Sequence, residues 1–140
     1  MTAKQYLLRY SRIQERLRQM DSELRYIEAQ IQSISGSGDG MPRGTDISDR
    51  TGNIAVMLAD AKEDYEHVRA EALRIRRSIE SVINMVEDPL QSRCLYERYV
   101  NCKEWKDVAD SIPISESYAK GRLHGNALES VRRILEVDTQ

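Results

Sequence analysis

Two runs of apolar residues, each repeating in strict steps of four and three, constrain the fold of this 140-residue chain more than any other feature. The first run extends from Tyr6 to Ile34, and the second extends from Ile54 to Val86. Such a repeat places the apolar side chains on one stripe of an α-helix, as in the seam of a coiled coil. The sequence therefore predicts two long helices, each with one narrow apolar seam and otherwise solvated faces.

The segment between the two runs predicts a connector. Residues 35–44 read Ser-Gly-Ser-Gly-Asp-Gly-Met-Pro-Arg-Gly, and this density of glycine and proline ends a helix. Four polar residues between positions 46 and 51 are candidate N-caps for the second helix, so we place the Gly-rich loop at 35–52. We expect residues 1–87 to form a long antiparallel helical hairpin with coiled-coil-like packing.

A lone hairpin with one narrow stripe per helix buries little apolar surface, and several arrangements remain open. The C-terminal helices, a second subunit or both would bury the apolar seams that the hairpin leaves exposed. Alternatively, the first helix pairs with its own copy in a dimeric coiled coil, or the hairpin is only a spacer.

A second domain is expected over residues 88–140. Asp88 and Pro89 predict the start of a helix, because Asp is favoured at the N-cap and Pro at the first helical position. The inward face of that helix is predicted to carry Leu90, Cys94, Leu95 and Tyr99. No stretch alternates in the manner of a β-strand, so we expect an all-α protein.

Residues 104–128 predict two short helices separated by a tight turn. Trp105, Val108, Ala109 and Ile112 have the spacing of one helix face. Pro113 disfavours helical geometry at Ile112 and ends the first helix, and Ser115 is placed to cap the second. In a helix-turn-helix, the outward residues of the second helix contact base edges and phosphates.

We therefore expect the helix over 115–128 to read the DNA major groove. Serine and lysine donate hydrogen bonds to phosphates and bases, and arginine binds guanine with two hydrogen bonds. A glycine lets the backbone approach DNA closely. The expected DNA-binding residues are Ser115, Glu116, Ser117, Lys120, Gly121, Arg122 and His124, with Arg132 and Arg133 on phosphates if the helix continues. His124 is alternatively a plain helix-surface residue, and the whole region is alternatively a three-helix packing unit with solvated charges.

Charge supports only a local DNA-binding face. The whole chain has a formal net charge of −2, whereas residues 115–135 carry +2. DNA binding would therefore depend on the basic side chains of this segment and not on the charge of the whole chain.

These landmarks resemble the C-terminal helix-turn-helix of sigma-70-like factors (region 4). The resemblance is carried by residues 95–99 (Leu-Tyr-Glu-Arg-Tyr), residues 105–109 (Trp-Lys-Asp-Val-Ala), Ile114-Ser115 and Ala127-Leu128. Residues 122–128, and the order of long helix, Gly-rich loop and second helix, are similar to phage and prophage regulators of Gram-positive bacteria of the ArpU/RinA type and their uncharacterised relatives. The resemblance implies sequence-specific DNA binding in the control of phage genes, such as late or packaging genes.

The chain departs from the sigma pattern at two places. The distance from Ser115 to Ala127 is one residue longer than usual, which leaves the register of the second helix open. Pro113 stands in the turn where glycine is common.

No residue pattern predicts catalysis, and we expect no enzyme activity, cofactor, metal or small-molecule substrate. His67 and His124 lie far apart, and Cys94 and Cys102 are eight positions apart, a spacing that favours buried packing over metal binding. The Gly-rich loop lacks the Gly-Lys-Ser/Thr of a phosphate-binding loop. Without a leader-like or membrane-spanning apolar stretch, we expect a cytoplasmic protein with reduced thiols.

The sequence thus favours a phage transcriptional regulator that binds double-stranded DNA. The hairpin would provide oligomerisation, with a dimer favoured, or a contact with RNA polymerase. Two alternatives remain. The first is a structural or packaging component such as an oligomer resembling the terminase small subunit, and the second is a protein-only adaptor.

Overall fold

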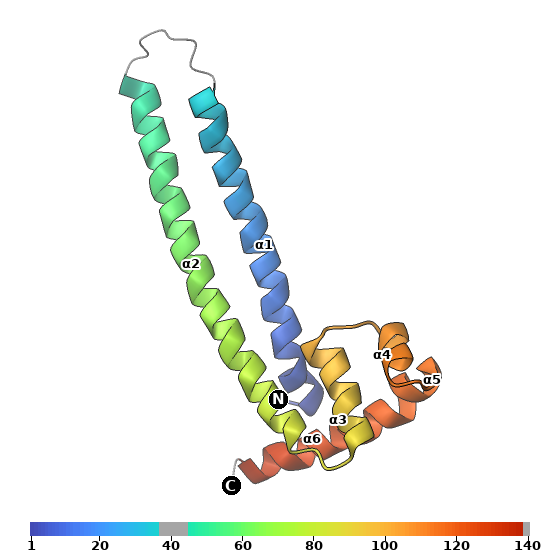
Figure 1. Cartoon of the computed structure of the whole chain (residues 1–140). Helices are drawn as coiled ribbons and strands as arrows, with labels where there is room; N and C mark the ends of the chain where they lie inside the picture. Colours follow the sequence, from blue (N-terminus) through green and yellow to red (C-terminus); the bar gives the residue numbers. More distant parts are fainter. Residues whose placement is uncertain (37–44, 139–140) are drawn as a thin grey trace. The chain divides into compact units, whose positions relative to one another are not determined.

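The computed structural model describes residues 1–36 and 45–138, and the side chains of residues 1–34 and 49–138. Helices joined by short turns and loops make up the described residues, and no strand occurs among them, which confirms the all-α class. The elements in chain order are α1 (Ala3–Gly36), α2 (Thr45–Asn84), α3 (Pro89–Leu95), η1 (Tyr96–Val100), α4 (Trp105–Ser111), α5 (Glu116–Tyr118), η2 (Ala119–Leu123) and α6 (His124–Asp138), as labelled in part in Figure 1. The elements η1 and η2 are short π-helical stretches.

The bounds of the two long helices agree with the two predicted apolar runs, except that the second helix begins earlier than expected. Helix α2 starts at Thr45, so residues 45–52 are helical and not part of the loop that we placed at 35–52. The reason is that Asp46 and Asp49 suit the first turns of a helix, where the helix dipole favours negative charge. Residues 37–44 of the predicted connector lie outside the described residues.

The chain divides into two compact units, and the division does not fall at residue 88. One unit is Gln14–Glu71, and the other combines Met1–Ile13 with Ala72–Gln140. The second unit therefore includes the start of α1 and the end of α2 together with all of the C-terminal helices. In these end segments Leu7, Ile79 and Ile83 are almost completely buried, which explains why they belong to the larger core.

The larger unit has a continuous apolar core. Its most deeply buried side chains come from both ends of the long helices and from the C-terminal helices: Leu7, Ile79, Ile83, Cys94, Leu95, Val108 and Val131. Around Val108, a cluster joins Cys94, Ile112 and Leu123, and Leu90, Trp105 and Ile114 pack against it. Each fully buried aliphatic side chain contributes about 1.5–3 kcal/mol to stability. The inward faces predicted for the helices after Asp88 and after Glu104 are confirmed.

The unit Gln14–Glu71 is more open. Leu17, Leu24 and Val68 are buried, but the remaining seam positions are only half-buried, among them Met20, Ile27, Ile31, Ile54, Leu58 and Ala61. Within this unit the segments of α1 and α2 lie side by side (Figure 1), and Lys62 Nζ lies 3.8 Å from Glu28 Oε1. Tyr26, Val56 and Met57 expose more than half of their surface. A pair of helices thus leaves its seams partly accessible to solvent.

Helix α3 begins as the sequence predicts. Asp88 Oδ1 accepts hydrogen bonds from the backbone N–H groups of Leu90 (2.9 Å) and Gln91 (3.2 Å), and Pro89 occupies the first helical position. The cap satisfies two N–H groups that have no partner inside the helix. Among the described residues, no helix has both the length and the apolar character needed to cross a membrane.

Candidate nucleic-acid interface

A tight turn joins α4 to the helix that carries the predicted DNA contacts. Ile112 leaves helical geometry (φ −107°, ψ 15°) before Pro113, so α4 ends at Ser111. The backbone N–H of Ile114 donates to the carbonyl of Ala109 at 3.2 Å, which closes the turn. Ser115 Oγ then accepts a hydrogen bond from the N–H of Tyr118 at 3.2 Å and caps α5, as predicted.

The helix after the turn is continuous over residues 116–138, but it contains a π-helical turn. In η2 the backbone N–H of His124 donates to the carbonyls of both Ala119 and Gly121. A π turn holds more residues than an α turn and thus accommodates an insertion within a helix. This π turn lies in the interval from Ser115 to Ala127, where the sequence left the register of the helix open. With the π turn in between, Ala119 and Ala127 are both completely buried, and this defines the register of the helix.

The same π turn places His124 inside the protein, which corrects our expectation that it faces DNA or lies on the helix surface. Only 9% of His124 is exposed. Its Nε2 lies 2.6 Å from the hydroxyl of Tyr99 in a buried hydrogen bond, and Trp105 contacts its ring edge-on with 4.6 Å between centroids. At the end of this π-helical stretch, His124 faces Tyr99 of η1 and Trp105 of α4.

His124 is uncharged at neutral pH. Burial, together with the smaller effect of the positive charges of Lys4 and Arg98, lowers its pKa to about 4. Burial also raises the pKa of Tyr99 to about 12, so the hydrogen bond joins two neutral groups. Arg98 lies over the Trp105 ring, 4.9 Å from its centroid, and donates to the carbonyl of Lys103 at 2.8 Å. The start of α6 is thus anchored to η1 and α4 by the contacts of uncharged His124 with Tyr99 and Trp105.

Sequence reasoning did not identify Tyr99 and Trp105 as partners of His124, or Lys4 as a neighbouring charge. Tyr99 and Trp105 were recognised only as core positions of their own helices. Their meeting with His124 depends on how α4 and α6 pack. Lys4 belongs to the first turn of α1, and no pattern in the sequence indicates that it approaches α6.

Six of the nine predicted contact residues lie in one exposed stretch that comprises the N-cap of α5, α5 itself and η2. These are Ser115, Glu116, Ser117, Lys120, Gly121 and Arg122, and all six are exposed. In the part of the chain that the structure describes, no carboxylate pairs with the side chain of Lys120 or Arg122. A Cβ atom added at Gly121 or Gly125 would meet nothing within 4 Å, so packing in the free protein does not require either glycine.

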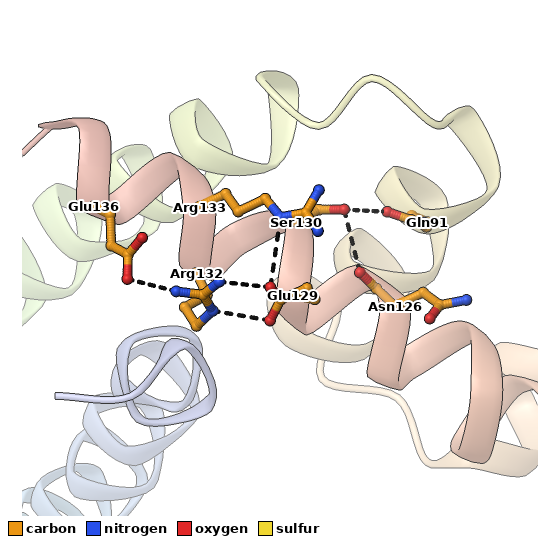
Figure 2. Close-up of polar contacts among 7 residues, drawn as sticks. All are labelled: Gln91, Asn126, Glu129, Ser130, Arg132, Arg133 and Glu136. Carbon is orange, nitrogen blue, oxygen red and sulfur yellow. Dashed lines mark hydrogen bonds and ion pairs between the residues drawn. The ribbon is translucent and has the colours of Figure 1, made fainter.

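Arg132 and Arg133 have a different environment, which Figure 2 shows. Two hydrogen bonds of 2.6 and 2.9 Å connect the Arg132 guanidinium to both oxygens of Glu129, and a third of 2.5 Å connects it to Glu136. Arg133 Nε lies 3.5 Å from the same Glu129. The hydrogen bonds from Arg132 lower the pKa of Glu129 to about 2. These two arginines are exposed, but both of their charges are compensated locally.

The rest of this unit offers little for other ligands. No group of three or more His, Cys, Asp or Glu side chains gathers to hold a metal within residues 1–36 and 45–138. Cys94 is buried, and burial raises its pKa to about 11, whereas Cys102 is exposed, which corrects our expectation that both pack inside. A groove of about 530 Å³ between the start of α1 and α6 mixes Lys4 and Arg132 with Glu129 and Glu136, so no single ligand charge fits it.

Residues 41–129 match the family described as "Protein of unknown function (DUF1492)", and this is more than half of the chain. The chain belongs to this family. The matched region runs through the whole of η2 and ends at Glu129, so it contains Lys120 and Arg122 but not Arg132 and Arg133. No curated protein and no solved structure matches the chain. The family description assigns no activity, and function must be argued from the residues of the site.

Proposed function

We propose that this member of the family is a sequence-specific DNA-binding regulator whose helix from Glu116 onward lies in the major groove. The observation that carries the proposal is the pair of exposed cations, Lys120 and Arg122, that lack a local acidic partner. They lie on a helix that follows a tight, capped turn. This helix packs against the buried apolar core of the larger unit. The resemblance to sigma region 4 and to ArpU/RinA-type regulators supports control of phage genes in the cytoplasm of the host cell.

The exposed side chains of α5 and η2 have the chemistry to bind in a DNA groove. The major groove admits an α-helix, and in helix-turn-helix proteins the N-terminal residues of the second helix contact the bases. Arg122 has the donor geometry for guanine, and Lys120 for phosphate. Ser117 adds a hydroxyl donor, and Gly121 leaves the backbone open to close approach.

The proposal also requires a second source of affinity. Two uncompensated cations neutralise few phosphates, and affinity for DNA depends on the number of phosphates that are neutralised. We propose that the long helices bring together two copies of the chain, or one copy and RNA polymerase. The half-buried seams of the unit Gln14–Glu71 support this role, because a partner helix would bury them further.

The full-length protein should bind duplex DNA at about 50 mM salt, where phosphate contacts are strongest, and should select a preferred sequence from a random pool. Fluorescence anisotropy measures the binding. A folded protein that fails to bind under these conditions would refute the proposal.

Two substitutions test which face is used. Arg122→Ala and Lys120→Ala should each weaken binding by about 1–3 kcal/mol while circular dichroism shows an unchanged fold. Arg16→Ala, which removes an exposed charge from α1 in the other unit, is the matched control and should leave the affinity unchanged. If all three variants bind DNA as tightly as the unmodified protein, the DNA-binding residues lie elsewhere on the molecule.

Light scattering separates the proposed regulator from the packaging alternative. A dimer, or a monomer that needs polymerase, fits the regulator, whereas a ring of eight or more copies with weak DNA binding fits a packaging component. Binding to a partner protein without DNA binding would instead identify an adaptor.

A further inference from the structure

The ion-pair network on α6 has no net charge, although it contains two arginines. Arg132 and Arg133 share Glu129, and Arg132 also bonds to Glu136, so two carboxylates balance two guanidiniums (Figure 2). Arg132 and Arg122 are on the same continuous helix, about 15 Å apart along its axis. That distance is suitable for contacting phosphates that flank the bases read by η2.

The helix that carries the network is held independently of Glu129. Ser130 Oγ donates a hydrogen bond of 2.6 Å to Gln91 Oε1 of α3, and the neighbouring Ala127 and Val131 are completely buried. Removing the charge of Glu129 should therefore change the electrostatics of the network without moving α6. The side chains of Arg132, Glu129 and Glu136 are also accessible to solvent, so DNA phosphates can reach the network.

We infer that Glu129 withholds the guanidiniums of Arg132 and Arg133 from DNA and confines phosphate contact to α5 and η2. The inference rests on the proposed function and adds to it a residue that limits affinity. The physical basis is competition for the same donors. The N–H groups of Arg132 that would bind a phosphate bidentately already bind both oxygens of Glu129. An approaching phosphate must displace this carboxylate and is also repelled by its charge.

A double-mutant cycle tests the inference on the full-length protein with a duplex of about 30 base pairs at two salt concentrations. Glu129→Gln should raise the affinity about 5- to 10-fold and steepen the salt dependence by one to two phosphate contacts. Replacing Arg132 and Arg133 together by Gln should change the affinity of the otherwise unmodified protein less than about two-fold. In that double-Gln background, Glu129→Gln should raise the affinity by less than about two-fold, because only the repulsion between its carboxylate and the phosphates is then removed.

Three results would overturn the inference. The first is an unchanged affinity in Glu129→Gln. The second is an equal gain in both backgrounds, which would show that only long-range charge is involved. The third is a large loss of affinity in the arginine double variant, which would show that the arginines already contact DNA. Failure of the proposed function is a distinct result, because then no variant binds the duplex at all.

Discussion

The exposed cations of the last helix have similar sequence contexts but different neighbours. Lys120 and Arg122 have no acidic partner among the described residues, whereas Arg132 and Arg133 share Glu129. Isolated surface ion pairs stabilise a protein by less than about 1 kcal/mol. Under the proposed function, their larger effect would be to decide which charges are available to DNA.

The buried His124 should make the stability of the fold depend measurably on pH. The folded state keeps His124 neutral down to a pKa of about 4, whereas an unfolded chain protonates it near 6.5. Between these values the unfolded state binds the additional proton, so stability should fall as the pH decreases from about 6.5 to 4. The loss should reach about 3 kcal/mol and should level off below pH 4.

Urea unfolding across this pH range measures the effect, with His124→Gln as the reference. Carboxylates titrate in the same window in both proteins, so the difference between their slopes isolates the histidine. Parallel curves for the two proteins would contradict a buried neutral His124.

At the scale of elements, the π turn η2 decides which residues of the last helix face inward. It also contains Gly121, whose missing side chain leaves open space on the outward face. Glycine inside a helix costs about 1 kcal/mol relative to alanine. Because nothing in the packing requires Gly121, the proposed DNA contact offers the reason for its presence.

Gly121→Ala should therefore separate stability from function. We expect the variant to be more stable by about 0.5–1 kcal/mol and to bind DNA more weakly, because the new methyl group projects toward the groove. Gly52→Ala in α2 is the matched control, since a Cβ there also meets nothing within 4 Å. It should raise the melting temperature without affecting DNA binding. Unchanged binding in Gly121→Ala would argue against close backbone approach.

At the scale of the whole molecule, burial is distributed unequally between the two units. Ile83 and Leu95 are almost completely buried in the larger unit, whereas Leu58 and Ile54 of the unit Gln14–Glu71 are only half-buried. Sites with few buried contacts open more readily. The two units are therefore expected to differ in local stability.

Two measurements check this difference. Ile83→Ala should destabilise the protein by about 2–5 kcal/mol, and Leu58→Ala should cost less. Amide hydrogens of residues 14–36 and 45–71 should exchange faster than those of the larger unit. Their exchange should slow at high protein concentration if a second copy covers the seams. Uniform exchange rates at all concentrations would contradict both the open seams and their proposed pairing.

The sequence by itself determined the fold class, the positions of the helices apart from the start of α2, and the turn and caps at Ile112, Ser115 and Asp88. These features depend on local chemistry, namely apolar periodicity, the fixed φ of proline and hydrogen bonds between neighbouring residues. Most of the outward residues of the candidate site follow from the same periodicity. Their exposure was therefore predictable, although their role stays a prediction.

Only the tertiary structure decided the register of the last helix and the surroundings of its charges. A regular helical period cannot reveal a π turn, because that turn depends on how Ala119 and Ala127 both reach the core. The burial of His124 follows from that register and from its contacts with Tyr99 and Trp105, which lie on other elements. The start of α1 likewise joins the C-terminal core through Leu7, because packing between segments that are distant in sequence does not follow from local periodicity.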